Sequence, residues 1–158
     1  GRSGNPLAHT MSSAKIDSIF INDQQSSEFF LHGNIAGKLG VPLVFVSGDA
    51  GLCEEVQDVS PNTTTHATMV GVGDSTISIQ PKESRLAIQK KVKSALSGDI
   101  TKCIWDHPDL FSLEVKFIKH QVAYRASHYP GASLIDAKTV HFETHNYDDI
   151  MRFMLFTV

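Results

Sequence analysis

Residues 41–49 read VPLVFVSGD, and this stretch decides the fold class. It is a continuous apolar run of strand length, which is typical of a strand buried on both faces of a parallel sheet. The stretch AGLCEEVQDVSP follows at residue 50, has apolar residues at helical spacing and stops at Ser60-Pro61. A buried strand followed directly by a helix is the start of a βαβ unit, so these residues predict an α/β fold.

The alternation of strands and helices extends upstream of this stretch. Residues 18–23 predict a short strand that stops at a turn. A helix is expected over 26–40, because a pair of serines suits its first residues and a glycine its end. Gly33 and Gly37 each weaken that helix by about 1 kcal/mol relative to Ala, so we expect them to mark close packing against a neighbouring backbone.

Downstream, residues 65–80 predict two short strands around a glycine-rich bend, and 81–98 predict the clearest helix of the chain, with Pro81 in its first turn. The expected inner face of this helix consists of Ile88, Val92, Ala95 and Leu96. The glycines of the bend, Gly71 and Gly73, lack the strand-to-helix context of a dinucleotide site. No residue is therefore predicted to bind a nucleotide cofactor.

After residue 100 the pattern changes. Residues 112–118 alternate apolar and polar side chains as a half-exposed strand does, and 139–146 predict another strand. The final helix, 147–158, has acids in its first turn, where the helix dipole favours them. The sequence thus predicts a βαβ-type sheet with flanking helices over residues 1–100, followed by a smaller α+β portion over 101–158 that serves assembly or forms a pocket.

Composition excludes several classes of protein. The net charge of −3 and the pI near 6.2 speak against binding to a phosphate backbone, which requires a basic stripe. The longest apolar runs are too short to span a bilayer. Cys53 and Cys103 are predicted to be buried free thiols. With no recognisable targeting segment, we expect a cytoplasmic protein with neither nucleic acid nor a membrane as partner.

Three residues in the first part of the chain carry candidate chemistry. His9 lies in the loop-like stretch PLAHT and is either a solvent-facing histidine or a general acid–base group. Glu28 falls in the first turn of the helix expected over 26–40, where a carboxylate also simply complements the helix dipole. His32 follows four residues later on the same helical face, so the two side chains form either a surface pair or half of a metal site.

The stretch HFETH at residues 141–145 offers a second arrangement. On a strand, His141, Glu143 and His145 would point to one side, which allows either a polar solvent face or a zinc site. The other face would carry Val140 and Phe142. The histidine spacing differs from that of the helical HExxH motif.

Several segments become informative when they are taken in order. GNPLAHTM (4–11), FINDQQSSE (20–28) and AGKLGVPLVFVSGDAGLCEEV (36–56), followed by a strand, a glycine-rich bend and a helix begun by proline, resemble the carboxy-terminal half of the D-aminopeptidase family of the dipeptide-operon type, metallopeptidase family M55. The similarity is strong from residue 4 to residue 56 and moderate to residue 98. Beyond residue 98 it rests mainly on the order of the elements.

This resemblance implies a pair of zinc ions, most of whose ligands lie in the amino-terminal half of the family's proteins and outside this chain. It implies that His9 is the catalytic histidine beside the metals and that Glu28 completes the zinc ligand set. The family usually carries asparagine four residues after this glutamate, whereas this chain has His32. His32 would therefore shape the substrate pocket, act as an extra ligand, or indicate that the site has drifted.

The function that follows from the resemblance is that of a zinc-dependent aminopeptidase, acting on short peptides or amino-acid amides with a preference for D-residues. The chain would begin in the loop after the last upstream zinc histidine and would be a fragment, active only with the amino-terminal half or a companion subunit. The family resemblance also implies assembly of copies into a ring. The alternative is a catalytically inactive relative that acts as a structural subunit of an assembly.

Overall fold

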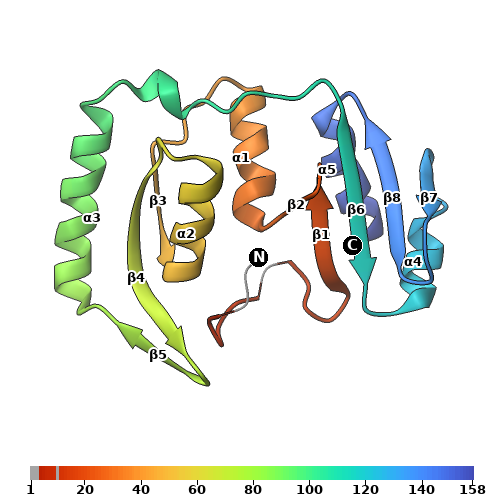
Figure 1. Cartoon of the computed structure of the whole chain (residues 1–158), viewed down its shortest axis with the longest axis horizontal. Coiled ribbons are helices and arrows are strands. Elements are labelled where there is room, and N and C mark those ends of the chain that lie inside the picture. The colour runs from red at the N-terminus through yellow and green to blue at the C-terminus, as the bar shows by residue number, and fades with distance from the viewer. Residues whose placement is uncertain (1–3, 10) are drawn as a thin grey trace. The chain divides into compact units, whose positions relative to one another are not determined.

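The computed structural model describes residues 4–9 and 11–158, and these residues form two compact units (Figure 1). Among the described residues, the first unit takes in residues 9–31 and 107–158. The second takes in residues 4–8 and 32–106. The prediction placed a single boundary at residue 100. The first of these units instead combines two segments that are far apart in the sequence.

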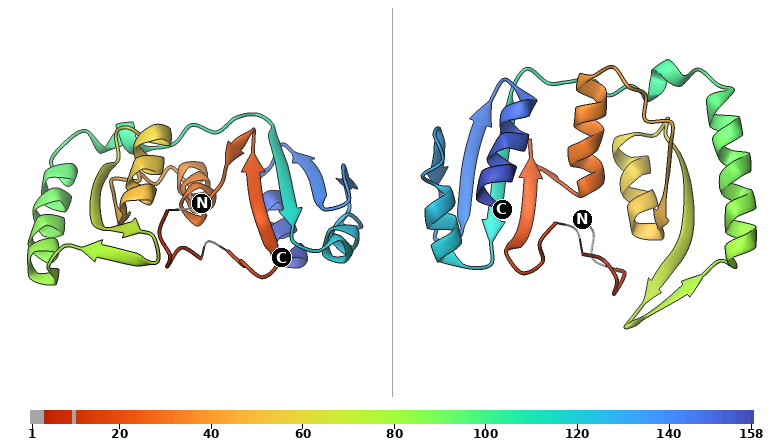
Figure 2. Two further views of the ribbon diagram at one scale, coloured as in Figure 1. Left: turned by 60° about the horizontal axis from the view of Figure 1, so that its bottom comes forward. Right: turned by 180° about the vertical axis from the view of Figure 1, so that it is seen from behind.

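The first unit is a five-stranded antiparallel sheet with the strand order β2-β1-β6-β8-β7. Its strands are β1 (Ile16–Ile21), β2 (Gln24–Gln25), β6 (Phe111–Phe117), β7 (Ala132–Leu134) and β8 (Thr139–Thr144). Two helices, α4 (His120–Ala126) and α5 (Tyr147–Thr157), pack on one face of this sheet (Figures 1 and 2). The pairing of β1 with β6 joins the two chain segments into one unit.

The core of the first unit follows the predicted alternation along β6. Leu113, Val115 and Phe117 are fully buried, and so are Ile150 and Phe153 of α5, the helix that packs on this strand. The strand predicted over 18–23 is β1, and it ends in a tight turn. The alternating residues therefore placed this strand correctly, and the helix predicted over 147–158 is confirmed as α5.

The second unit contains a three-stranded sheet with the order β3-β4-β5. Its elements are β3 (Phe45–Asp49), α2 (Ala50–Val59), β4 (Thr64–Val72), β5 (Ser75–Ser78), α3 (Pro81–Leu96) and the 3-10 turn η1 (Ile100–Cys103). β3 and β4 are parallel and α2 connects them, so β3-α2-β4 is the βαβ unit predicted from residue 41 onward. α2 and α3 lie on opposite sides of the sheet (Figure 2).

Two details of the second unit differ from the sequence-based expectations. The predicted strand 41–49 begins only at Phe45, and β1 is not part of this sheet. On α3, Leu96 is 57% exposed rather than inward-facing, and Ser84 is buried instead, within 3.2 Å of the Nε2 atom of buried His66 on β4. Ser84 lies one turn before Ile88, so the buried polar pair extends the predicted inner face toward the start of α3, whereas Leu96 at the end of the helix does not belong to that face.

The helix predicted over 26–40 is α1 (Glu28–Lys38). Its first residues, 28–31, belong to the first unit, and the rest belongs to the second. After it, Gly40 adopts a φ of 66°, a left-handed conformation that favours glycine and ends the helix.

Both cysteines are free and buried, as predicted, and both lie in the second unit. Burial raises the pKa of the Cys53 thiol on α2. The Sγ atom of Cys103 donates a hydrogen bond to the carbonyl oxygen of Asn62, at 3.3 Å.

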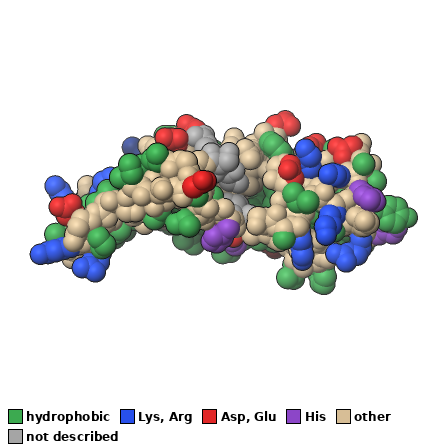
Figure 3. Space-filling view, turned by 90° about the horizontal axis from the view of Figure 1, so that it is seen from below, with side chains coloured by type: hydrophobic (Ala, Val, Ile, Leu, Met, Phe, Trp, Pro, Cys, Tyr) green, Lys and Arg blue, Asp and Glu red, His purple; other side chains and the backbone are tan. Residues whose placement is uncertain are grey.

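Two features of the helices bear on possible partners. None of the described helices has the length and apolar character that a membrane crossing requires. Basic side chains gather over α3 in the view from below (Figure 3). The exposed basic residues of this helix are Lys82, Arg85, Lys90, Lys91 and Lys93.

Candidate functional site

All three candidate residues predicted near the start of the chain have exposed side chains. His9 lies in the loop that precedes β1, Glu28 is the first residue of α1, and His32 follows one helical turn later. Among the described residues, none of the three side chains forms an ion pair or hydrogen bond. They are therefore available for a ligand or substrate, and their roles remain predictions.

The position of Glu28 is set by the start of α1. The Oγ atom of Ser27 accepts a hydrogen bond from the amide of Phe30, at 3.2 Å, and the Ser27 carbonyl accepts one from the amide of Leu31, at 3.0 Å. Ser27 is buried, and this capping arrangement fixes the first turn of the helix. The helix start thereby holds Glu28 at the surface while Leu31, one turn away, is buried.

Tyr147 anchors the same helical turn to the core of the first unit. Its hydroxyl donates a hydrogen bond to the carbonyl oxygen of Leu31, at 2.9 Å. Its ring is buried in an edge-to-face contact with Phe111, with centroids 5.0 Å apart, and in another with His107, at 5.8 Å. Burial raises the pKa of Tyr147 above its ordinary value, so the hydroxyl remains a donor in the folded protein.

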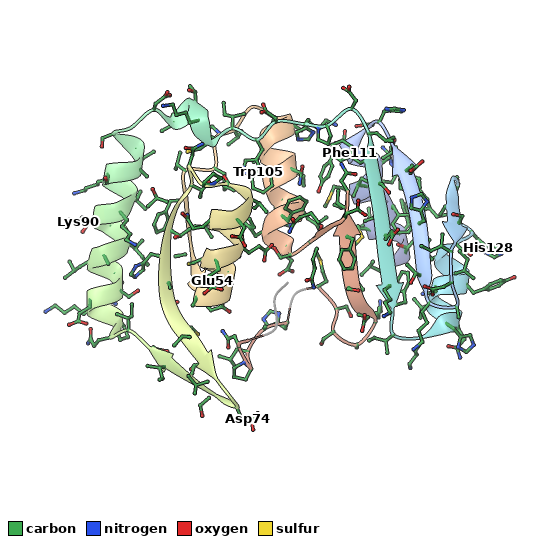
Figure 4. The ribbon with its side chains drawn as sticks, viewed as in Figure 1. Glu54, Asp74, Lys90, Trp105, Phe111 and His128 are labelled. Atoms are coloured by element: carbon green, nitrogen blue, oxygen red, sulfur yellow. The ribbon has the colours of Figure 1, made fainter. Side chains whose placement is uncertain are left out.

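The turn of α1 that follows His32 is held by Trp105, which Figure 4 shows beside this helix. A Cβ atom at Gly33 would lie 2.6 Å from ring atom Cη2 of Trp105, and one at Gly37 would lie 2.7 Å from its carbonyl oxygen. The indole Nε1 donates a hydrogen bond to the Oγ atom of Ser60, at 3.0 Å. The prediction of close packing against a neighbouring backbone is confirmed for Gly37, whereas Gly33 packs against the ring of Trp105.

The loop that leads to His9 is held in the second unit by Asn5. The Asn5 side chain donates to the Oδ2 atom of Asp49, at 2.8 Å, and accepts from the amide of Leu7, at 2.9 Å. Asp49 also caps α2 by accepting a hydrogen bond from the amide of Leu52, at 2.8 Å. The residue after His9, Thr10, lies outside the described residues.

The donor side chains of the described residues do not make a complete zinc site. Within residues 4–9 and 11–158, no three His, Cys, Asp or Glu side chains come together as a metal would require. Structural and catalytic zinc ions take three or four protein ligands. Glu28 and His32, which are neighbours on one helical face, therefore supply at most part of a ligand set.

The stretch HFETH does not form a metal site either. His141 is within 3.1 Å of the Ser112 hydroxyl on β6 and 3.6 Å from Glu143, as neighbours on a polar sheet face are. His145 lies beyond the end of β8, and its Nδ1 atom is 2.6 Å from the carbonyl oxygen of Asp109. The strand ends too early to place His145 beside the other two, so the polar-face interpretation is the one the structure supports.

The residues that position α1 are not evident from the sequence pattern. Tyr147 looked like the first apolar residue of a terminal helix, and Trp105 like part of a connecting loop. Buried tyrosine and tryptophan side chains usually place their polar atom on a partner, but the sequence does not say which one. Only the fold joins Tyr147 to Leu31 and Trp105 to Ser60.

The comparison with protein families defines the class of this chain. The family model described as D-aminopeptidase, a peptidase family designated M55, matches residues 1–156. The chain therefore belongs to the D-aminopeptidase family, as the resemblance in its sequence indicated.

Two comparisons with individual proteins agree with this assignment. The D-aminopeptidase of Bacillus subtilis (strain 168) is 28% identical over 139 residues, which are 86% of this chain and 50% of that protein. The solved structure of the Zn-dependent D-aminopeptidase DppA from Bacillus subtilis, described as a self-compartmentalizing protease, is similar with a TM-score of 0.83 and 24% identity. That similarity covers 90% of this chain and 53% of DppA, and it shows the same fold. The chain spans about half the length of the relatives it matches.

Proposed function

We propose that this chain is the carboxy-terminal half of a zinc-dependent aminopeptidase that hydrolyses short peptides or amino-acid amides, with a preference for D-residues. The match of the D-aminopeptidase family to residues 1–156 is the observation that carries the proposal. Because the matched relatives are about twice as long, the chain would act together with an amino-terminal half, on the same polypeptide or as a companion. Copies of the complete protein would assemble into a closed ring, in line with the description of DppA as self-compartmentalizing.

Glu28 would supply one zinc ligand from this chain. Its carboxylate is exposed at the first turn of α1, and the hydrogen bond from Tyr147 to Leu31 fixes that turn. The described part of the chain has no set of three ligands in one place, and the remaining ligands of the two zinc ions would come from the amino-terminal half.

His9 would accept and donate the proton that amide hydrolysis moves. Its imidazole is exposed, and a histidine ring can both accept and donate a proton, which suits a general acid–base group. His32 occupies the position where the family usually carries asparagine, one turn after Glu28. It would line the substrate pocket or act as an extra ligand.

A second function class remains open, that of an inactive relative which keeps the fold and the assembly surface. The specific observation in its favour is the incomplete donor set among the described residues. The two proposals differ in whether the complete protein binds zinc and hydrolyses amides. Intact mass of the purified particle shows whether an amino-terminal segment of similar size accompanies this chain.

The Glu28→Gln variant tests the enzymatic proposal. The isosteric change removes the anionic oxygen that zinc requires, so zinc content and amide hydrolysis of the complete protein should both fall. Glu83→Gln is the matched control, because Glu83 is also exposed in the first turn of a helix, α3. Both variants lose about 0.3–1 kcal/mol of interaction with a helix dipole. A difference in zinc content or activity between them would therefore come from a ligand role of Glu28. Full zinc occupancy and unchanged activity of Glu28→Gln would refute the assignment of this site.

A further inference from the structure

The surroundings of β3 do not match its sequence. The apolar stretch that contains β3 is typical of a strand enclosed on both faces, in the middle of a parallel sheet. In the structure β3 lies at the edge of its sheet, with β4 as its one neighbour among the described strands. None of the five residues of β3 is buried. In β6, which does lie inside a sheet, every second residue is buried.

The direction of the backbone groups of β3 follows from its pairing. The Val44 carbonyl accepts a hydrogen bond from the amide of Thr64, at 3.1 Å, and the register pairs Phe45 with Thr64. In a parallel ladder with this register, alternate residues bond to the partner strand, so Val46 and Gly48 face β4. The N–H and C=O groups of Phe45 and Ser47 therefore point to the outer edge of the sheet.

This edge lacks the protection that the edges of the five-stranded sheet have. The edge strands of the first unit, β2 and β7, are only two and three residues long, and short edge strands limit pairing with further chains. β3 is five residues long, and its outer side from Phe45 to Ser47 has neither a lysine nor a proline. Before β3, the outward amide of Leu43 is already satisfied by the Cys103 carbonyl, at 2.9 Å. The open stretch of the edge is thus confined to Phe45 and Ser47.

We propose that β3 is an inner strand of a larger sheet in the complete protein, and that a β-strand of the amino-terminal half pairs with the backbone of Phe45 and Ser47. The occupant is chosen because the matched relatives contain about as much chain again as this one. Strand addition satisfies the outward backbone groups and covers the half-exposed apolar side chains of β3 in one step. The inference rests on the proposed function, since it needs the amino-terminal half.

Hydrogen exchange of the complete protein, resolved to single amides, tests this pairing. The amides of Val46 and Gly48 serve as internal references because they bond to β4. If a strand covers the outer edge, Phe45 and Ser47 exchange within about tenfold of these references. If the edge is free, they exchange about 100-fold faster or more, and the proposal is overturned.

Ser47→Pro provides a second test, with Ser47→Ala as its matched control. Proline removes the outward N–H of residue 47 but none of the hydrogen bonds to β4, which is the position where an edge strand tolerates it. In the complete protein, we expect the amide of Phe45 to exchange at least tenfold faster in Ser47→Pro and as in the wild type in Ser47→Ala. A Phe45 amide that stays as protected in Ser47→Pro as in the wild type contradicts the pairing, and the wild-type exchange data decide the question if this variant does not fold.

The outcomes separate the pairing from the proposed function. Free outer amides in a protein that binds zinc and hydrolyses amides overturn the pairing and leave the function intact. Protected outer amides in a protein without zinc or hydrolysis support the pairing and overturn the enzymatic proposal. A particle whose intact mass contains no amino-terminal segment overturns both.

Discussion

Gly33→Ala is the substitution whose effect the structure predicts most closely. In an unhindered helix this change stabilises by about 1 kcal/mol, because alanine restricts the unfolded chain and suits the helix. At Gly33 the new Cβ atom would lie 2.6, 2.8 and 2.9 Å from three ring atoms of Trp105. Each of these distances is too short for carbon atoms in contact, so the ring or the helix must move.

The indole ring of Trp105 has little room to move. Its Nε1 atom is hydrogen-bonded to Ser60, at 3.0 Å, and its own backbone lies against Gly37. Overpacking costs about 1–3 kcal/mol, and a ring held at both ends places the cost near the upper end of this range. After the helical gain of about 1 kcal/mol, the net loss of stability is about 2 kcal/mol. That corresponds to a melting temperature lower by about 4–8 °C for a protein of about 150–250 residues, and by less for a longer complete protein.

Thermal unfolding of the complete protein measures this effect, and Gly51→Ala is the matched control. Gly51 lies in the first turn of α2, and a Cβ atom there would come no closer than 3.4 Å to its nearest neighbour, Oδ1 of Asp49. We expect this control to leave the melting temperature unchanged or to raise it slightly. The double variant Gly33→Ala/Trp105→Phe should recover at least 1 kcal/mol relative to additivity, because a smaller ring makes room. A Gly33→Ala protein that melts as high as Gly51→Ala would refute the account of Trp105 as a fixed partner of α1.

Three further predictions concern the candidate site and its support. His9→Ala should lower turnover of the complete protein by about 10²–10⁴-fold with zinc content unchanged. Loss of zinc in this variant would instead indicate that His9 is a ligand, and normal turnover would indicate that it is a solvent-facing residue. His32→Asn should lower zinc affinity in a titration with metal if His32 is an extra ligand, and should change only the KM values of peptide substrates if it lines the pocket. Tyr147→Phe should cost about 0.5–1.5 kcal/mol at neutral pH in chemical denaturation. Because burial raises the pKa of Tyr147 above its ordinary 10.0, the folded protein keeps a proton that the unfolded chain releases, so wild-type stability should fall as the pH rises above about 10 and the variant should lack this fall.

Local patterns predicted the elements of the chain well. α1, α2 and α5 were placed within a few residues, since caps and helical periodicity are written in neighbouring residues. Pairing between strands was not predicted, because β1 and β6 meet across a long stretch of chain. The buried face of α3 was also predicted only in part. Leu96 is exposed, and Ser84 is buried because it lies against His66 of the neighbouring sheet.

The candidate site was predictable in its residue types and not in its geometry. The resemblance singled out His9, Glu28 and His32, and the structure places all three at the surface. The contacts that position α1 join residues far apart in sequence, such as Tyr147 and Leu31, which are 116 residues apart. No spacing rule reaches over such a distance.

Because the two cysteines are buried, their rate of reaction with a thiol reagent measures how often the second unit opens. A thiolate is the reactive form, and both sulfur atoms lie inside the second unit, one with a raised pKa and the other hydrogen-bonded to a carbonyl. A thiol reagent can therefore react only when that unit opens, and the rate of labelling reports the opening rate or its equilibrium. Neither Cys53 nor Cys103 is among the candidate site residues, so labelling of these two thiols would report on opening of the fold and not on catalysis.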